Sequence, residues 1–204
     1  MTTSLALFLL SAAGISLSGV MLPGPLTAAT IAKGYRDKNA GILIALGHAV
    51  VELPLMALVY FGFAYFFTSP DVKKIIGVAG GLMLILMGLM VFRSTRKTVD
   101  EVADFPYNSL TTGIIMTGAN PYFFLWWATI GIALIAGAAE FGIYGLLLFA
   151  VVHWLCDAFW EQFVSMSVFK TRHLWTQKVQ KIVFSICALV LVGFGGWFCF
   201  SVFL

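Results

Sequence analysis

Apolar residues occur in six long runs along the chain, and short polar segments separate them. A bilayer core of about 30 Å needs about 20 helical residues, and each run is roughly 18 to 30 residues long. Each run therefore predicts one membrane-spanning helix, with the longer ones tilted or kinked. The short alternating segments that are typical of a transmembrane β-barrel do not occur. The predicted helices occupy residues 5–22, 40–67, 75–92, 110–139, 141–169 and 182–204.

Composition strengthens the membrane interpretation. Of the 204 residues, 61% are hydrophobic and 10% are charged, and the mean hydropathy is +0.99. An average soluble domain carries about 25% charged residues. These values exclude a soluble enzyme, a disordered chain and a disulfide scaffold, and predict one transmembrane domain over residues 1–204. The first run lacks the basic start of a secretory signal, since the first Lys or Arg is Lys33, so we expect it to be a mature helix.

The basic residues predict the orientation of the chain in the cell membrane. Ten of the twelve Lys and Arg residues fall in the first, third and fifth predicted loops. The positive-inside rule places those loops in the cytoplasm and both termini outside, extracellular or periplasmic. The same asymmetry accounts for the net charge of +3 without a nucleic-acid partner.

The two halves of the chain have equal numbers of predicted helices. Three helices lie in residues 1–92, a cytoplasmic link covers 93–108, and three more lie in 109–204. Because three is odd, the second half enters the membrane from the opposite side. The predicted fold class is thus an all-α membrane protein of six transmembrane helices arranged as two inverted three-helix repeats, an architecture common in secondary transporters.

Both second helices carry a His-x-x-x-acid motif. His48 precedes Glu52 by four residues, and His153 precedes Asp157 by four. This spacing puts each histidine and its acid on one helical face. Both acids are expected near the membrane midplane. Glu161 lies one turn beyond Asp157 on the same helical face. A mid-bilayer acid costs about 2.5–3.5 kcal/mol on insertion scales and marks ion or proton pathways.

Three interpretations of these motifs stay open. A buried acid beside a histidine can exchange a proton near physiological pH, which suits a proton-coupled transporter. Two histidines and two carboxylates (His48, Glu52, His153 and Asp157) are also a plausible first shell for Zn²⁺ or Mn²⁺. Each pair could instead be a structural hydrogen bond within its helix. On the preferred interpretation the chain needs neither a metal nor a cofactor.

The first helices of both halves are interrupted by proline. Pro23, Gly24 and Pro25 follow the first helix, and Asn120 and Pro121 break the fourth. Proline frees backbone carbonyls that a membrane protein must satisfy internally. Paired breaks in two halves indicate a substrate site. A G-x-x-x-G motif in the third helix, residues 77–81, favours a helix contact within the monomer or a dimer interface.

The Pro-Gly-Pro motif, Gly34, Gly41 with Gly47, and Asn120-Pro121 make the chain resemble the lysine-exporter (LysE/RhtB) family over nearly its whole length. That resemblance implies efflux of amino acids or related metabolites, driven by a proton or ion gradient and often by a homo-oligomer. The larger superfamily also contains cadmium exporters and thiol–disulfide electron carriers. In the family an acid commonly follows the glycine directly, where this chain has His48.

We expect a gradient-driven exporter of small molecules that lies in the lipid bilayer and is not an enzyme, since no nucleophile–base arrangement or phosphate loop is visible. Glu52 and Asp157 are the expected coupling acids, with His48 and His153 as partners. The alternatives are a divalent-cation exporter, a thiol–disulfide carrier and a passive channel. Cys156, Cys187 and Cys199 lie in apolar runs without a C-x-x-C pair, which is more typical of packing residues.

Overall fold

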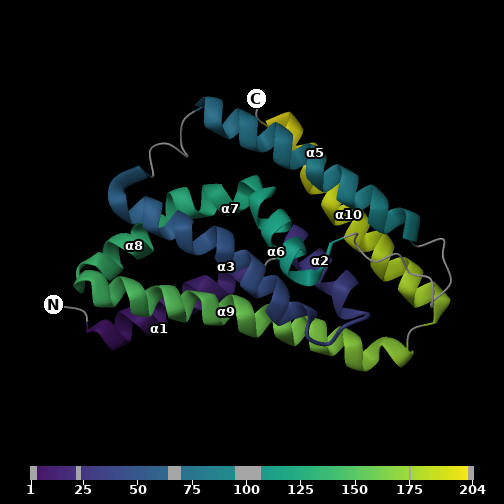
Figure 1. The fold of residues 1–204 in the computed structure, drawn as a ribbon, viewed down its shortest axis with the longest axis horizontal. Coiled ribbons are helices and arrows are strands. Elements are labelled where there is room, and N and C mark those ends of the chain that lie inside the picture. Colours follow the sequence, from purple (N-terminus) through teal and green to yellow (C-terminus); the bar gives the residue numbers. More distant parts are fainter. Residues whose placement is uncertain (1–3, 22–23, 64–69, 95–106, 175, 202–204) are drawn as a thin grey trace.

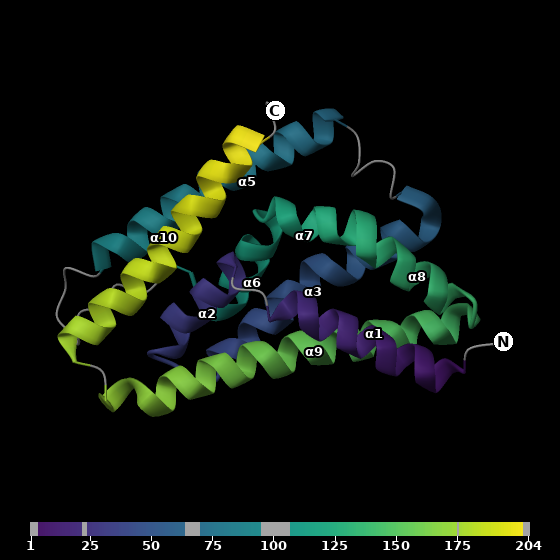
Figure 2. The same ribbon diagram turned by 180° about the vertical axis from the view of Figure 1, so that it is seen from behind.

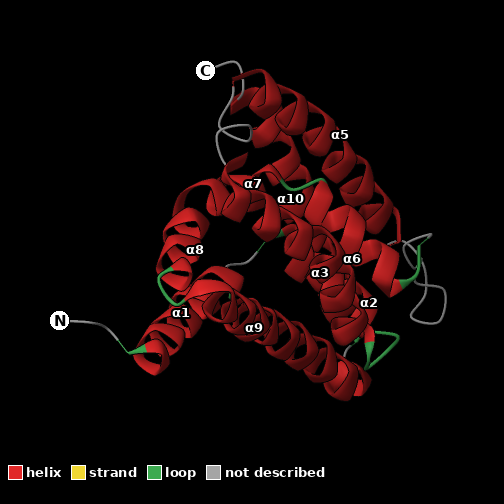
Figure 3. Cartoon of the chain, turned by 60° about the vertical axis from the view of Figure 1, so that its left-hand side comes forward, coloured by secondary structure: helices red, strands yellow, loops and turns green. Residues whose placement is uncertain are grey.

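The computed structural model describes residues 4–21, 24–63, 70–94, 107–174 and 176–201. All secondary structure in these segments is helical, which confirms the all-α class there (Figure 3). The helices are α1 (Leu5–Val20), α2 (Pro25–Gly34), α3 (Ala40–Leu58), α5 (Pro70–Ser94), α6 (Ser109–Gly118), α7 (Pro121–Trp126), α8 (Ile132–Ala139), α9 (Gly142–Thr171) and α10 (Gln177–Ser201). Two π-helical segments, η1 (Val59–Phe63) and η3 (Trp127–Gly131), follow α3 and α7, and a short 3₁₀ turn, η4 (Arg172–Leu174), follows α9.

The helices expose apolar side chains and bury polar ones, as expected for a protein in lipid. Leu46 and Val50 of α3 and Leu155 and Phe159 of α9 are exposed, whereas Glu52 is 1% exposed. Within the described residues, four helical segments are long and apolar enough to cross a membrane: Ala40–Gly62, Tyr122–Ala139, Gly142–Leu174 and Gln177–Phe200. The bent pair of α1 and α2 raises the number to five. The chain is thus a multi-pass membrane protein, and six spans stay a prediction.

Helix α2 lies where a polar loop was expected, so that part of the sequence interpretation is wrong. α2 bends away from α1 by 75° and begins at Pro25, whose missing N–H is tolerated at a first helical position. Its small residues allow close packing. Ala28 and Ala29 are buried, and a Cβ on Gly34 would collide with the backbone of Ser165 in α9.

Glycine contacts join α3 to α6. A Cβ on Gly47 would collide with the carbonyl of Leu110, and one on Gly113 would collide with the carbonyl of Ile44. α3 also packs on α9, and α9 packs on α1 (Figures 1 and 2). The second helix of each predicted repeat therefore contacts the first helix of the other, as an inverted repeat requires, although the repeat itself stays a prediction.

α5 and α10 form a pair along one side of the molecule (Figure 1). A Cβ on Gly81, the last glycine of the G-x-x-x-G motif, would collide with Gly195 and Cys199 of α10. At this glycine the motif serves a contact within the monomer.

The predicted cytoplasmic loops meet at one end of the fold. The ammonium group of Lys33 donates to the carbonyl of Tyr107 at 2.5 Å. The guanidinium of Arg172 donates to the carbonyls of Tyr35 at 3.0 Å and Arg36 at 3.3 Å. Residues before α3, before α6 and after α9 therefore share one end, as the positive-inside assignment requires.

Candidate functional site

A cavity of about 370 Å³ lies between the helices that carry the predicted site residues. The two helix breaks, both histidines and all three intramembrane acids contribute to its wall. Its lining comprises Ser16, Gly19, Val20, Gly24, Pro25, Leu26, Thr27, His48, Glu52, Asn120, Tyr122, Phe123, Trp126, Trp127, His153, Asp157, Glu161 and Phe194. Residues from six helices and both predicted repeats thus converge on one site.

Glu52 lies between the two histidines. Its Oε1 is 2.9 Å from Nε2 of His48 on the same helix. The same oxygen is 3.1 Å from Nε2 of His153, which reaches across from α9. All three side chains are buried. The i, i+4 pair expected in α3 is therefore present, and a cross-helix bond joins it to α9.

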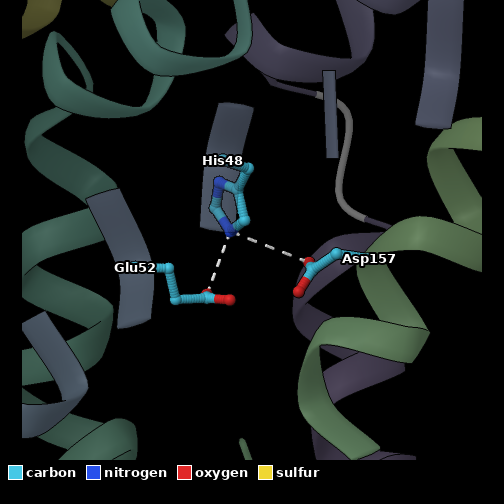
Figure 4. Close-up of side chains that lie close together, drawn as sticks. All are labelled: His48, Glu52 and Asp157. Carbon is cyan, nitrogen blue, oxygen red and sulfur yellow. Dashed lines mark hydrogen bonds and ion pairs between the residues drawn. The ribbon is translucent and has the colours of Figure 1, made fainter. Parts of the chain in front are cut away.

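The second expected pair is arranged differently. Nε2 of His153 is 3.8 Å from Oδ2 of Asp157, an ion-pair separation too long for a hydrogen bond. Asp157 Oδ1 lies 4.0 Å from Nε2 of His48, and Figure 4 shows this carboxylate and that of Glu52 on either side of the His48 ring. The partner of His153 is thus Glu52, because the facing helix brings that carboxylate closer than the acid one turn along α9.

Two hydroxyl groups contact the Nδ1 atoms of the two histidines. The Ser16 hydroxyl donates to the carbonyl of Ala12 at 2.7 Å and lies 2.6 Å from Nδ1 of His153. A hydroxyl has one proton to donate, so when that proton goes to Ala12 the Ser16 oxygen accepts from Nδ1–H. Thr117 does the same for His48, donating to Gly113 at 2.8 Å and accepting from Nδ1 at 2.8 Å.

With both Nδ1 atoms protonated, both Nε2 atoms face the single oxygen Glu52 Oε1. When Glu52 is ionised, two hydrogen bonds to that oxygen require a proton on each Nε2, which makes both rings imidazolium. With Glu52 and Asp157 ionised, the four groups then sum to zero charge. Loss of one proton leaves a net negative charge and removes one of the two bonds to Glu52. The cluster therefore links its proton content to the contact between α3 and α9.

Glu161 lies one turn beyond Asp157 on α9 and is 1% exposed. Among the described residues, its Oε2 is one of five buried side-chain atoms without a hydrogen-bond partner, the others being Thr30 Oγ1, Glu52 Oε2, Asp157 Oδ2 and Trp160 Nε1. Its backbone is held tightly, because a Cβ on Gly41 would collide with the Glu161 carbonyl. The adjacent Gln162 accepts from the backbone N–H of Ile42 at 2.9 Å, in the first turn of α3.

The helix breaks border the same cavity. Gly24 precedes α2 as its N-cap residue, and Pro25 is the first residue of α2. Asn120 caps α7 by accepting from the N–H of Tyr122 at 3.1 Å, and Pro121 is the first residue of α7. Pro23 lies outside the described residues. At each break the described proline therefore starts a new helix, whereas Pro54 lies inside α3.

The buried histidines and acids also have the chemistry of a cation site. One ligand atom each from His48, Glu52 and Asp157 lie within 4.8 Å of one another. The hydroxyl groups on Nδ1 leave Nε2 of both rings directed at the carboxylates, as in metal sites where a second bond orients each histidine. The residues thus fit a divalent cation.

The cysteines take no part in this cluster. Cys156, Cys187 and Cys199 are free thiols. Cys156 Sγ lies 3.8 Å from the carbonyl of Ala13, and Cys187 is buried in an apolar cluster with Leu84 and Leu191.

Several site residues were missed by the sequence interpretation or left undecided. Ser16 and Thr117 were not recognised as histidine partners, although both are small polar residues in apolar helices, which is a usable signal. Tyr122, Phe123 and Trp126 line the cavity. Trp127 does so too while packing on the His153 ring, with ring centroids 5.0 Å apart. Sequence alone cannot decide whether such aromatics face lipid or a pocket.

Comparison with known proteins gives two matches. The family described as LysE type translocator matches residues 17–201. A curated relative, YcgF of Bacillus subtilis (strain 168), is 26% identical over 192 residues, which cover 91% of this chain and 90% of the relative. The name of that protein assigns it an inferred role in amino acid efflux. No solved structure matches the chain.

Proposed function

The chain belongs to the LysE type translocator family, and from this premise we propose that it exports amino acids from the cell in exchange for protons. Its family is one of transporters, so the chain is a membrane transport protein and not an enzyme. The inferred efflux role of the Bacillus subtilis relative supports amino acids as substrates. The positive-inside pattern supports cytoplasmic odd-numbered loops and external termini.

The observation that carries the proposal is the sharing of Glu52 by two histidines from different helices. In the doubly protonated cluster, His153 bonds to Glu52 and holds α9 against α3. Release of a proton from Nε2 of His153 removes that bond and leaves the nitrogen lone pair facing a lone pair of Glu52 Oε1. The contact between α3 and α9 is thereby weakened. A proton taken from the outside and released to the cytoplasm would in this way alternate the access of the cavity.

The predicted inverted repeat supports this cycle. Ser16 of α1 contacts His153 of α9, and Thr117 of α6 contacts His48 of α3. Each hydroxyl therefore belongs to one proposed repeat and each histidine to the other. A pseudo-two-fold axis in the membrane plane would relate the two pairs, and such symmetry allows inward-open and outward-open states to exchange roles.

A flux assay tests the proposal. Purified protein is reconstituted into proteoliposomes. These are loaded with a panel of radiolabelled amino acids, and flux is measured with and without an imposed pH gradient. We expect at least one amino acid to move against its own concentration gradient only when the pH gradient is present. Substrate that moves only down its own concentration gradient, at the same rate with and without the pH gradient, would indicate a passive channel and would contradict proton exchange.

The close approach of ligand atoms from His48, Glu52 and Asp157 favours a second candidate function, export of a divalent cation. Zn²⁺ or Mn²⁺ would be the substrate, bound by His48, Glu52, His153 and Asp157 in place of the protons. Metal analysis of purified protein separates the two functions. Stoichiometric Zn²⁺ or Mn²⁺ that is lost in a His48→Ala/His153→Ala double variant, and kept when the exposed His173 is changed to Ala, would favour cation export.

A further inference from the structure

The cavity offers separate groups for the two charges and the side chain of one α-amino acid. We infer that the carboxylate of the substrate binds at the first turn of α2, that its ammonium binds Glu161, and that its apolar side chain contacts the aromatic wall formed by Tyr122, Phe123, Trp126 and Phe194. This inference rests on the proposed function and narrows the substrate to zwitterionic amino acids with apolar side chains.

The first turn of α2 presents backbone N–H groups at the cavity wall. Gly24, the N-cap residue, provides no side-chain hydrogen bond. The N–H groups of Leu26 and Thr27, the second and third helical residues, have no carbonyl partner within the helix. Both residues line the cavity. The positive end of the helix dipole adds to the attraction of these N–H groups for a carboxylate.

Glu161 is the acid that the proton cluster leaves available. His48, Glu52, His153 and Asp157 balance one another in the doubly protonated state, whereas Glu161 Oε2 is buried in the cavity wall without a hydrogen-bond partner. Of the described residues that line the cavity, none is Lys or Arg. A cation from the substrate would neutralise this carboxylate.

The two charged subsites are close enough for one amino acid. Gly34, at the end of α2, contacts Ser165, and the start of α2 borders the cavity with Glu161, so α2 and α9 run in the same direction. At 1.5 Å per residue, Pro25 lies about 14 Å and Glu161 about 6 Å back from that contact. Helical side chains lean toward the N-terminus of their helix, so the Glu161 side chain extends from α9 in the direction of the first turn of α2, with which it lines the cavity.

The remaining wall selects the side chain. Tyr122, Phe123 and Trp126 of α7 and Phe194 of α10 provide it. While the histidines balance Glu52 and Asp157, no unbalanced acid of the described lining is left for a second ammonium group once Glu161 has bound the first, which disfavours basic amino acids. A volume of about 370 Å³ is in the range of small-molecule sites and accommodates a large apolar side chain.

The test uses four probes on the purified full chain: L-phenylalanine, L-phenylalaninamide, phenethylamine and 3-phenylpropionate. Binding is measured by isothermal titration at fixed pH. We expect L-phenylalanine to bind at least tenfold more tightly than each of the other three, which lack either the carboxylate or the ammonium group. Equal affinity for L-phenylalanine and its amide would overturn the carboxylate subsite without requiring any variant.

Two variants assign the subsites. Gly24→Asp places a carboxylate at an N-cap whose extended backbone accepts it, so it should occupy the N–H groups and lower L-phenylalanine affinity at least tenfold without weakening phenethylamine binding. Asn108→Asp, at the N-cap of α6 outside the cavity lining, is the control. Glu161→Gln should weaken binding of the three probes that carry an ammonium group, whereas Glu140→Gln, at an exposed acid, should not. Unchanged binding in folded Gly24→Asp or Glu161→Gln would overturn the corresponding subsite.

These outcomes separate the inference from the proposed function. If proteoliposomes export amino acids against a gradient while the probes fail to discriminate, the binding orientation is wrong and amino acid export stands. If no amino acid of the panel is bound or transported, both fail together.

Discussion

Nε2 of His153 lies 3.1 Å from Oε1 of Glu52, across the interface between α9 and α3. Because His48 bonds to the same oxygen at 2.9 Å, this carboxylate contacts one histidine of its own helix and one of α9. A bond between two helices that depends on a proton is a direct way to connect proton movement to helix movement.

Removal of the Ser16 hydroxyl should weaken the cluster of histidines and acids without changing any of its four side chains. Ser16→Ala leaves the buried Nδ1–H of His153 without its acceptor, a loss of about 1–3 kcal/mol. We therefore expect flux driven by the pH gradient to fall by about tenfold. Ser11→Ala is the matched control, because the Ser11 hydroxyl also bonds to the carbonyl four residues earlier but is exposed. Equal flux in the two variants would contradict the role of Ser16.

The contact between α3 and α6 should not tolerate added volume. Gly113→Ala directs a methyl group into the carbonyl of Ile44, and overpacking of this kind typically costs about 1–3 kcal/mol. For a chain of this size each kcal/mol lowers Tm by about 2–4 °C. Gly14→Ala should leave Tm nearly unchanged, since a Cβ there meets nothing within 4 Å. Thermal unfolding in detergent measures both.

Both termini should lie on the external side of the membrane, extracellular or periplasmic. The contacts of Lys33 with Tyr107 and of Arg172 with Tyr35 gather the basic segments at one end, and basic segments stay in the cytoplasm. A reporter that is active only outside the cytoplasm should therefore be active when fused after Leu204. Activity only of a cytoplasmic reporter at this position would reverse the assigned orientation.

Much of the site could be predicted from spacing within single helices. The i, i+4 separation of His48 and Glu52 placed both on one face, and the polarity of Asp157 and Glu161 in an apolar run required that they face inward. The structure brings these residues together around one cavity with Gly24, Pro25 and Asn120. Such predictions succeed because they depend only on helical geometry and on the cost of a charge in lipid.

Relations between helices could not be predicted in this way. The preference of His153 for Glu52 over Asp157 depends on how α9 is rotated against α3, which side-chain spacing along one helix does not determine. The partnership of Thr117 with His48 requires the close approach that Gly113 permits. Helix α2 was missed although Pro25 at a first helical position and the following alanines favour a helix, because Lys33 and Arg36 gave this segment the composition of a loop.

The most direct test of the central claim is proton-driven export in Glu52→Gln. Glutamine keeps the volume of the side chain and can still hydrogen bond, but it cannot carry the charge that holds two imidazolium groups. Uphill amino acid flux in proteoliposomes with a pH gradient should fall to background, while exchange at equal concentrations persists in a folded protein. Glu140→Gln, at the exposed end of α8, should transport like the wild type. Uphill flux in Glu52→Gln equal to that of the wild type would remove Glu52 from the coupling mechanism and contradict the account.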